Sequence, residues 1–166
     1  IGATMYSSTI ENVMSEVTVS GPERTGGLVG QFGGRRENPA IIRNCAVYAD
    51  VKGGTATGGL VGLIWKGGNI AIIENSIYVG TVSGGTPGAI VGQNGSDNGY
   101  ISILNNIYYC ELSEHELGSI GFSENTNNVS ITNVVSKTAD EIKNNGVSIL
   151  GSAWELKTGA SYPTLK

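Results

Sequence analysis

A short glycine-rich segment returns three times along this chain, and its spacing limits the folds that the chain can adopt. The segment reads TGGLVGQFGG from Thr25, TGGLVGLIWKGG from Thr57 and, in degenerate form, GAIVGQNGSDNG from Gly88. A second landmark, an apolar residue followed two positions later by Asn, recurs at intervals of 32, 31, 31 and 27 residues. Its members are Ile10–Asn12, Ile42–Asn44, Ile73–Asn75, Leu104–Asn106 and Ile131–Asn133. Repeats of this length are typical of solenoids, in which each copy adds one structural unit.

The residues between these landmarks keep a fixed register. Seven positions beyond each of the first three landmark asparagines stands a valine, namely Val19, Val51 and Val82. The intervening sequence alternates with a period of two, as a strand with one inward face does. Copies stacked about 4.8 Å apart would pair each backbone with the copies above and below, and equivalent side chains would form columns. We predict that each glycine-rich segment is the second strand of a coil, with an inward apolar residue at Leu28, Leu60 and Ile90.

The predicted fold is all-β: a right-handed parallel β-helix of about four to five rungs, in one domain over residues 1–166. The 26 glycines among 166 residues disfavour helices and suit tight turns between short strands. A β-propeller would need repeats of ~40–50 residues, and a leucine-rich repeat would need its Leu-x-x-Leu-x-Leu pattern. The coils are expected over residues 1–134 and a C-terminal cap over residues 135–166.

The last third of the chain changes character after the repeat decays. Thr138 is followed three residues later by Glu141, which is the spacing of a capping box. This pattern predicts a short helix from about Ala139 to Lys143, with Gly146 as its stop. Because an open solenoid end exposes apolar residues and strand edges, we expect Trp154 and Tyr162 to pack in a cap.

Charge, hydropathy and cysteine spacing exclude several classes of protein. The net charge of −4 argues against a nucleic-acid partner, and no apolar run approaches the ~20 residues of a membrane span. Cys45 and Cys110 lack metal-ligand spacing, so we interpret them as small buried apolar residues, with a disulfide as the alternative. The single histidine, His115, is expected in an exposed loop, and no cofactor is predicted.

The GGLVG cores, joined to segments such as IIRNCAVYADVKG, resemble the GLUG motif, a Gly-Leu-x-Gly repeat of bacterial surface proteins. Such repeats occur beside immunoglobulin A-cleaving zinc metallopeptidases and in adhesin-like proteins, and the resemblance covers roughly residues 10 to 113. It implies a secreted or surface-anchored β-helical module. We separately expect the chain to be a fragment of a larger protein. The resemblance implies no peptidase here, because that activity resides in a separate domain with a His-Glu-x-x-His motif.

The segments after each glycine-rich core vary most, and stacking would bring them to one side of the coil. We therefore predict a ligand or partner surface there. Its residues are Phe32, Arg35, Arg36, Trp65, Lys66, Asp97 and Tyr100. Trp65 could stack on a sugar ring or bind a protein. The alternative is that Phe32, Ile64 and Trp65 fold back over the coil as local packing.

Two classes of function remain open from the sequence. The first is a non-catalytic extracellular module for adhesion, or for presentation of another domain as a spacer, whose partners would be a host glycan, a glycoprotein or neighbouring domains. The alternative is a carbohydrate-binding or carbohydrate-active β-helix that resembles polysaccharide lyases or hydrolases. Such enzymes need clustered carboxylates, whereas the acids here are scattered. Glu11, Arg43 and Glu74 share one offset and are expected to form an exposed stripe of alternating charge.

Overall fold

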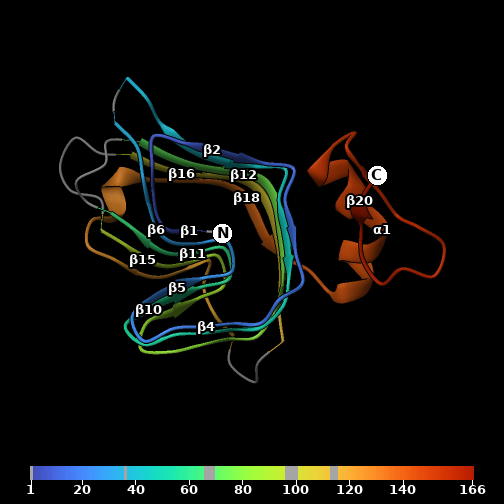
Figure 1. Ribbon diagram of the computed structural model, residues 1–166, viewed down its shortest axis with the longest axis horizontal. Coiled ribbons are helices and arrows are strands. Elements are labelled where there is room, and N and C mark those ends of the chain that lie inside the picture. The colour runs from blue at the N-terminus through green and yellow to red at the C-terminus, as the bar shows by residue number, and fades with distance from the viewer. Residues whose placement is uncertain (1, 36, 66–69, 96–100, 113–115) are drawn as a thin grey trace.

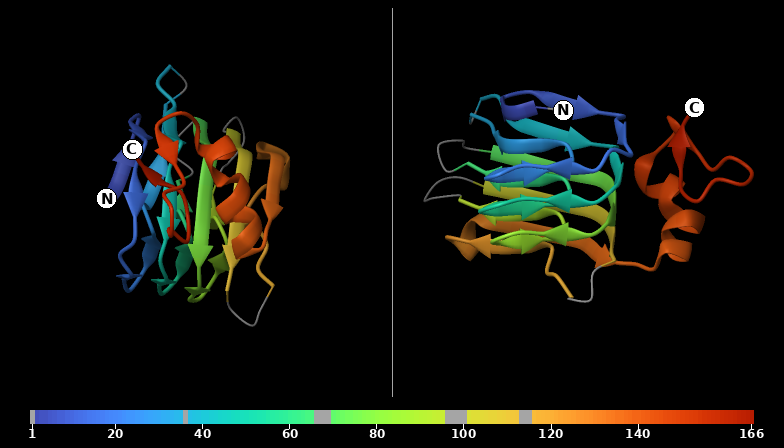
Figure 2. Two further views of the ribbon diagram at one scale, coloured as in Figure 1. Left: turned by 90° about the vertical axis from the view of Figure 1, so that its right-hand side faces the viewer. Right: turned by 60° about the horizontal axis from the view of Figure 1, so that its bottom comes forward.

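The computed structural model describes residues 2–35, 37–65, 70–95, 101–112 and 116–166. These residues form a parallel β-helix of about four turns, with its C-terminal segment packed against one side. The strands of successive turns lie directly above one another (Figure 2, right). The predicted all-β solenoid is therefore confirmed.

The largest sheet consists of parallel strands that bend once around a corner of the coil. Its strands are β2 (Thr9–Glu11), β3 (Met14–Ser15), β7 (Ala40–Arg43), β8 (Ala46–Tyr48), β12 (Ile70–Gly80), β16 (Ile101–Glu111) and β18 (Val129–Ser136). β2 and β18 lie at its two ends, so the first and last turns of the coil form the outer edges of this sheet.

Three smaller parallel sheets close each turn. A five-stranded sheet contains β1 (Gly2–Tyr6), β6 (Val29–Gly33), β11 (Val61–Ile64), β15 (Val91–Asn94) and β17 (Ile120–Ser123). One three-stranded sheet contains β4 (Val19–Ser20), β9 (Val51–Lys52) and β13 (Val82–Ser83). The other contains β5 (Arg24–Gly26), β10 (Ala56–Gly58) and β14 (Pro87–Gly88). Figure 1 shows these strands around the cross-section of the coil.

The landmark asparagines form the corner of the largest sheet. All five adopt left-handed backbone angles, with φ between 48° and 54°. Asn tolerates this conformation better than other non-glycine residues, which explains why Asn recurs there. In addition, Asn106 Nδ2 donates to Asn75 Oδ1 at 2.8 Å, and Asn133 Nδ2 donates to Asn106 Oδ1 at 2.7 Å. A ladder of amide hydrogen bonds is therefore present in the last three turns.

Equivalent inward residues stack in columns, as the register predicts. Val19 pairs with Val51, and Val51 pairs with Val82. The leucine of the glycine-rich segment is also buried in each turn, with no exposed surface at Leu28, Leu60 or Ile90. The strand begins one residue later than that leucine in each turn, so the glycine-rich segment is both the corner and the start of a strand.

The recurrent glycines allow two sheets of each turn to touch through their backbones. A Cβ atom on Gly62 would lie 2.5 Å from the backbone N of Thr25. A Cβ atom on Gly58 would lie 2.5 Å from the backbone N of Gly92. No side chain fits in these places, because real Cβ contacts are essentially never closer than 3.0 Å. The repeated glycines are therefore required by close packing between the β5–β10–β14 sheet and the β6–β11–β15 sheet.

A 3₁₀ helix (Thr126–Asn128) precedes β18, and the chain then leaves the coil into α1 (Ala139–Leu150) and an antiparallel pair, β19 (Trp154–Glu155) and β20 (Thr164–Leu165). The predicted capping box is confirmed: Thr138 Oγ1 accepts from Glu141 N at 3.2 Å, and Thr138 N donates to Glu141 Oε2 at 2.9 Å. The predicted stop at Gly146 is wrong, because the helix continues to Leu150 and ends at Gly151 with a φ of 88°.

The C-terminal segment covers the side of the coil and not the end at which a cap is predicted from the sequence. Ile142, Leu150 and Trp154 are buried against the outer face of β8, β12 and β16 in a second apolar cluster. Trp154 Nε1 donates to Asn44 O at 3.1 Å, and the Tyr162 ring stacks on Tyr48 with centroids 4.8 Å apart. Figure 2 (left) shows this segment lying across the sheet. The packing roles predicted for Trp154 and Tyr162 are confirmed, at a different place.

Replacing Asn75 should separate the two contributions of the asparagine corner. Asn75→Gly retains a residue that tolerates positive φ but loses the amide hydrogen bond, so we expect a loss of about 1 kcal/mol. Asn75→Ala also forces Ala into the left-handed region and should cost about 1 kcal/mol more. Urea unfolding followed by circular dichroism measures both values. Equal effects of the two substitutions would contradict the conformational part of this explanation.

Replacing Gly146 by Ala should destabilise the protein although it improves helix propensity. A Cβ atom there would lie 2.8 Å from Pro163 Cγ and 2.9 Å from Ile77 Cδ1. The resulting overpacking should cost about 1–3 kcal/mol, which outweighs the gain of about 1 kcal/mol expected for Gly→Ala in a free helix. Ser148→Ala, at an exposed position of the same helix, is the control. Stabilisation by Gly146→Ala would show that the helix does not pack against the coil in this way.

Candidate functional site

The structure divides the predicted surface residues into buried, exposed and undescribed groups. Phe32 is fully buried, so it belongs to the core and not to the surface on which it was predicted. Arg35 is exposed, in a turn where its N–H donates to Asn38 O at 2.8 Å. Trp65 is 38% exposed. Four predicted residues, Arg36, Lys66, Asp97 and Tyr100, lie outside the described part of the chain, as does His115.

Trp65 is held at the rim of the coil by stacking of the chain on the previous turn. It follows directly after β11, and its backbone N donates to Phe32 O at 2.9 Å. In the next turn Gly95 N donates to Ile64 O at 2.9 Å, so the ladder continues just beyond the strands. Phe32 and Ile64 themselves point into the core, as the local-packing alternative proposed for these two residues. Of Phe32, Ile64 and Trp65, only Trp65 presents its side chain at the surface.

A pocket of about 220 Å³ lies beside Trp65 and crosses several turns of the coil. Its lining consists of Arg24, Thr55, Leu63, Trp65, Gln93, Gly95 and Glu124. These residues come from four turns and are up to 100 positions apart in the sequence, so only the stacking brings them together. The pocket offers an aromatic ring, a guanidinium group, an amide and one carboxylate, which is a set of groups that can bind a polar ligand through hydrogen bonds and ring contacts.

Side-chain pairing organises one wall of this pocket. Arg24 Nη1 donates to Gln31 Oε1, which orients the guanidinium group along the outer face of β6. Gln31, Leu63 and Gln93 occupy one register column on that face. Arg24, Gln93 and Glu124 were not among the residues predicted from the sequence. The sequence did hold one signal for this wall of the pocket. A Gln directly follows two of the three glycine-rich cores, at equivalent positions of the repeat, so stacking places Gln31 and Gln93 in one column.

Two described carboxyl groups, those of Asp50 and Glu141, have a pKa below the ordinary value. Hydrogen bonds from Thr81 lower the pKa of Asp50, chiefly through its backbone N–H at 2.8 Å. Glu141, the capping residue, also has a lowered pKa, mainly because of the Thr138 N–H. Glu124 is the single carboxylate among the residues listed above as lining the pocket. A glycosidase-type site normally needs two carboxyl groups, one of them with a raised pKa.

The predicted charge stripe forms on the outer surface of the largest sheet. Glu11, Arg43 and Glu74 are register neighbours, and Arg43 Nη2 lies 2.9 Å from Glu11 Oε2. This hydrogen bond raises the pKa of Arg43. Both side chains are exposed, so we assign the pair a minor structural role.

Both cysteines are free and buried, as the sequence interpretation proposed. Burial raises the pKa of Cys45 to about 11, and it also raises the pKa of Cys110. Within the described ranges, no group of three or more His, Cys, Asp or Glu side chains is placed to hold a metal ion. No helix in that same part of the chain is long and apolar enough to cross a membrane.

Comparison with protein-family models and with curated proteins gave no match. Among solved structures, the chain is similar to one described as a "putative immunoglobulin A1 protease" from Bacteroides ovatus, with a TM-score of 0.65 and 23% identity. The similarity covers 96% of this chain and 48% of that one, so the chain spans about half the length of its structural neighbour. At this identity the likeness shows the shared fold. The resemblance to GLUG-motif proteins stays a prediction that agrees with this neighbour.

Both thiols should resist alkylation in the folded protein. With a pKa of about 11, only about one Cys45 side chain in a thousand is a thiolate at pH 8, and burial also blocks access. Mass spectrometry after iodoacetamide treatment should therefore find the native chain largely unlabelled, and the urea-unfolded chain labelled at both cysteines. Labelling in the native state at the rate of the unfolded chain would show that the two cysteine sites open readily.

Proposed function

We propose that this chain is a non-catalytic extracellular module of a bacterial surface protein, and that it binds a glycan or glycoprotein at the surface around Trp65. The observation that carries the proposal is the pocket in which Trp65 lies beside Arg24, Gln93 and Glu124. An exposed aromatic ring can stack on the apolar face of a sugar, while amide and charged groups hydrogen-bond its hydroxyls. Adhesion is the role that such a site would serve.

The architecture supports a surface module in a second way. Loops on one side of a solenoid are supported by a rigid stack of strands, so they can vary without loss of the fold. The carboxyl ends of β6, β11 and β15 lie on one side of the coil, because these strands pair in parallel and in register. The extracellular location and the bacterial surface context rest on the GLUG resemblance alone.

Substitution of Trp65 tests the proposed site. We expect Trp65→Ala to weaken binding on a glycan array or to host glycoproteins at least tenfold, which corresponds to about 1.4 kcal/mol. Trp65→Phe should retain part of the affinity, because a smaller ring can still stack. Leu156→Ala is the matched control, because Leu156 is an exposed apolar residue with the same 38% exposure and lies in the C-terminal segment.

Each other result selects a different function. Binding that survives Trp65→Ala at full strength would remove this pocket as the site. A failure to bind any glycan or glycoprotein, with the fold intact, would favour a spacer that presents other domains. Turnover of a polysaccharide by the isolated chain, abolished by Glu124→Gln, would favour the carbohydrate-active alternative.

A further inference from the structure

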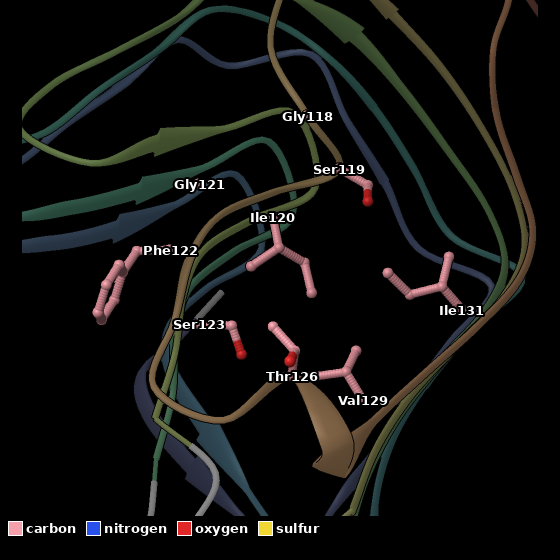
Figure 3. A pocket seen from close by; sticks show the side chains of 9 residues that line it. All are labelled: Gly118, Ser119, Ile120, Gly121, Phe122, Ser123, Thr126, Val129 and Ile131. Carbon is pink, nitrogen blue, oxygen red and sulfur yellow. The ribbon is translucent and has the colours of Figure 1, made fainter.

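The C-terminal end of the coil is open and hollow. β17 and β18 are the last strands of the two largest sheets, and the apolar side chains of Phe122 and Ile131 are 48% and 51% exposed there. A cavity of about 560 Å³ lies between these strands. Figure 3 shows Ile120, Val129 and Ile131 around it. The chain leaves β18 for α1 on the side of the coil, so its own continuation through residue 166 does not cover this end.

The hollow follows from a loss of side-chain volume along one core column. Phe32, Ile64, Asn94 and Ser123 occupy equivalent positions in successive turns. The two polar members are paired: Asn94 Nδ2 donates to Ser123 Oγ at 3.0 Å, and Ser102 Oγ donates to Asn94 Oδ1 at 2.6 Å. The side chains of this column thus become smaller along the coil, from the phenyl ring of Phe32 to the hydroxymethyl group of Ser123. The last layer of the core is left with space that its own residues do not fill.

The N-terminal end of the coil differs from the C-terminal end at the equivalent position of one column. Ile10, the first member of the column that ends at Ile131, is only 5% exposed, whereas Ile131 is 51% exposed. β1 and β2 are the first strands of the same two sheets that end in β17 and β18. One molecule thus carries an edge strand of each sheet at both ends of the coil, and the strands have the same direction at both.

We propose that a second copy of this chain stacks its N-terminal turn on the hollow C-terminal end, so that the coil continues from one copy into the next. β2 of the second copy adds to β18 of the first, and β1 adds to β17, in the parallel register of every other turn. Ile10 then follows Ile131 in its column. Met5, which precedes Phe32 in register, takes the position after Ser123.

The backbone groups at the two ends match in this register. Ile41 N donates to Ser8 O, and Asn12 N donates to Arg43 O, so the even-numbered residues of β2 bond to β7. The N–H groups of Thr9 and Glu11 therefore point to the open side of β2, because alternate residues of a strand bond to opposite neighbours. By the same repeat, the carbonyls of Val129 and Ile131 point to the open side of β18. The proposed stacking pairs these groups.

The asparagine ladder has a direction that continues across the same junction. In the last three turns, the later Asn donates its Nδ2 to Oδ1 of the Asn in the turn before it, from Asn106 to Asn75 and from Asn133 to Asn106. Asn133, the last member, uses its Nδ2 toward Asn106 and has its Oδ1 on the side of the open end. Asn12 of a second copy stands at the register position that donates to this oxygen. The contact therefore extends an interaction that the fold already uses.

Charge does not oppose the contact. In residues 118–136, which form the open end, Glu124 is the single charged residue. The charged column of the outer sheet face, which begins with Glu11, ends at the neutral Thr132. Glu11 of a second copy would therefore meet a threonine. Because the two contacting ends differ, the contact is heterologous and produces linear oligomers whose length depends on concentration.

Two variants that each block one end test this arrangement. Ile131→Lys places a charge in the hollow, and Thr9→Pro removes an edge N–H that β2 does not use within the molecule. Sedimentation velocity of the full chain should show concentration-dependent oligomers for the unmodified protein and a dissociation constant raised at least tenfold in each variant. Thermal melting checks that both variants fold, and Thr9→Lys replaces Thr9→Pro if the proline lowers the melting temperature. Leu156→Lys, on the side of the molecule, is the control and should change nothing.

Mixing the two variants gives the decisive measurement. Ile131→Lys retains a working N-terminal end and Thr9→Pro a working C-terminal end, so an equimolar mixture should form dimers that grow no further. A monomeric unmodified protein at every concentration would overturn the proposal. Oligomers that neither variant affects would place the contact on another surface and overturn it too. Dimerisation of Thr9→Pro alone would show contact between two C-terminal ends, which is a different arrangement.

Discussion

Parallel hydrogen bonding between equivalent residues of successive turns is the interaction on which this molecule depends. A turn of about thirty residues has too little apolar surface to be stable alone, and each turn gains its backbone partners and its core only from its neighbours. Two local constraints keep the turns in register. Asparagines adopt the left-handed backbone at one corner, and glycines allow two sheets to touch where no Cβ atom fits. Side chains between these points can vary.

The same dependence explains where the molecule departs from a uniform stack. Buried polar side chains occur in several turns, and in the later turns Asn94 and Ser102 are hydrogen-bonded to each other. A buried polar pair is tolerated because its hydrogen-bonding groups are satisfied. The side of the coil is covered by α1 and the segment around Trp154, whose indole N–H is bound by the Asn44 carbonyl. This segment covers the side of the coil and leaves the last strands, β17 and β18, as edge strands at its C-terminal end.

The pocket beside Trp65 shows how a repeat builds a site without a local motif. Arg24, Leu63, Gln93 and Glu124 belong to different turns, and each holds an ordinary surface position in its own repeat. Variation of single residues at equivalent positions would change the ligand chemistry while the coil stays intact. A site of this kind suits a binding module, because recognition can change without cost to the stack.

The sequence by itself determined the parallel stack, because periodic landmarks report directly on equivalent positions. The columns of Val19 and Leu28, the asparagine corner and the capping box at Thr138 all follow from spacing and local preference. The sequence could not place the C-terminal segment. Propensity alone marks Gly146 as the end of a helix, whereas in the fold Gly146 lies inside the helix, because a side chain there would collide with Pro163 and Ile77. It also could not show that Phe32 is buried or that Arg24 and Glu124 share a pocket. Those facts depend on which residues the stacking brings together across many turns, and only the tertiary structure decides that.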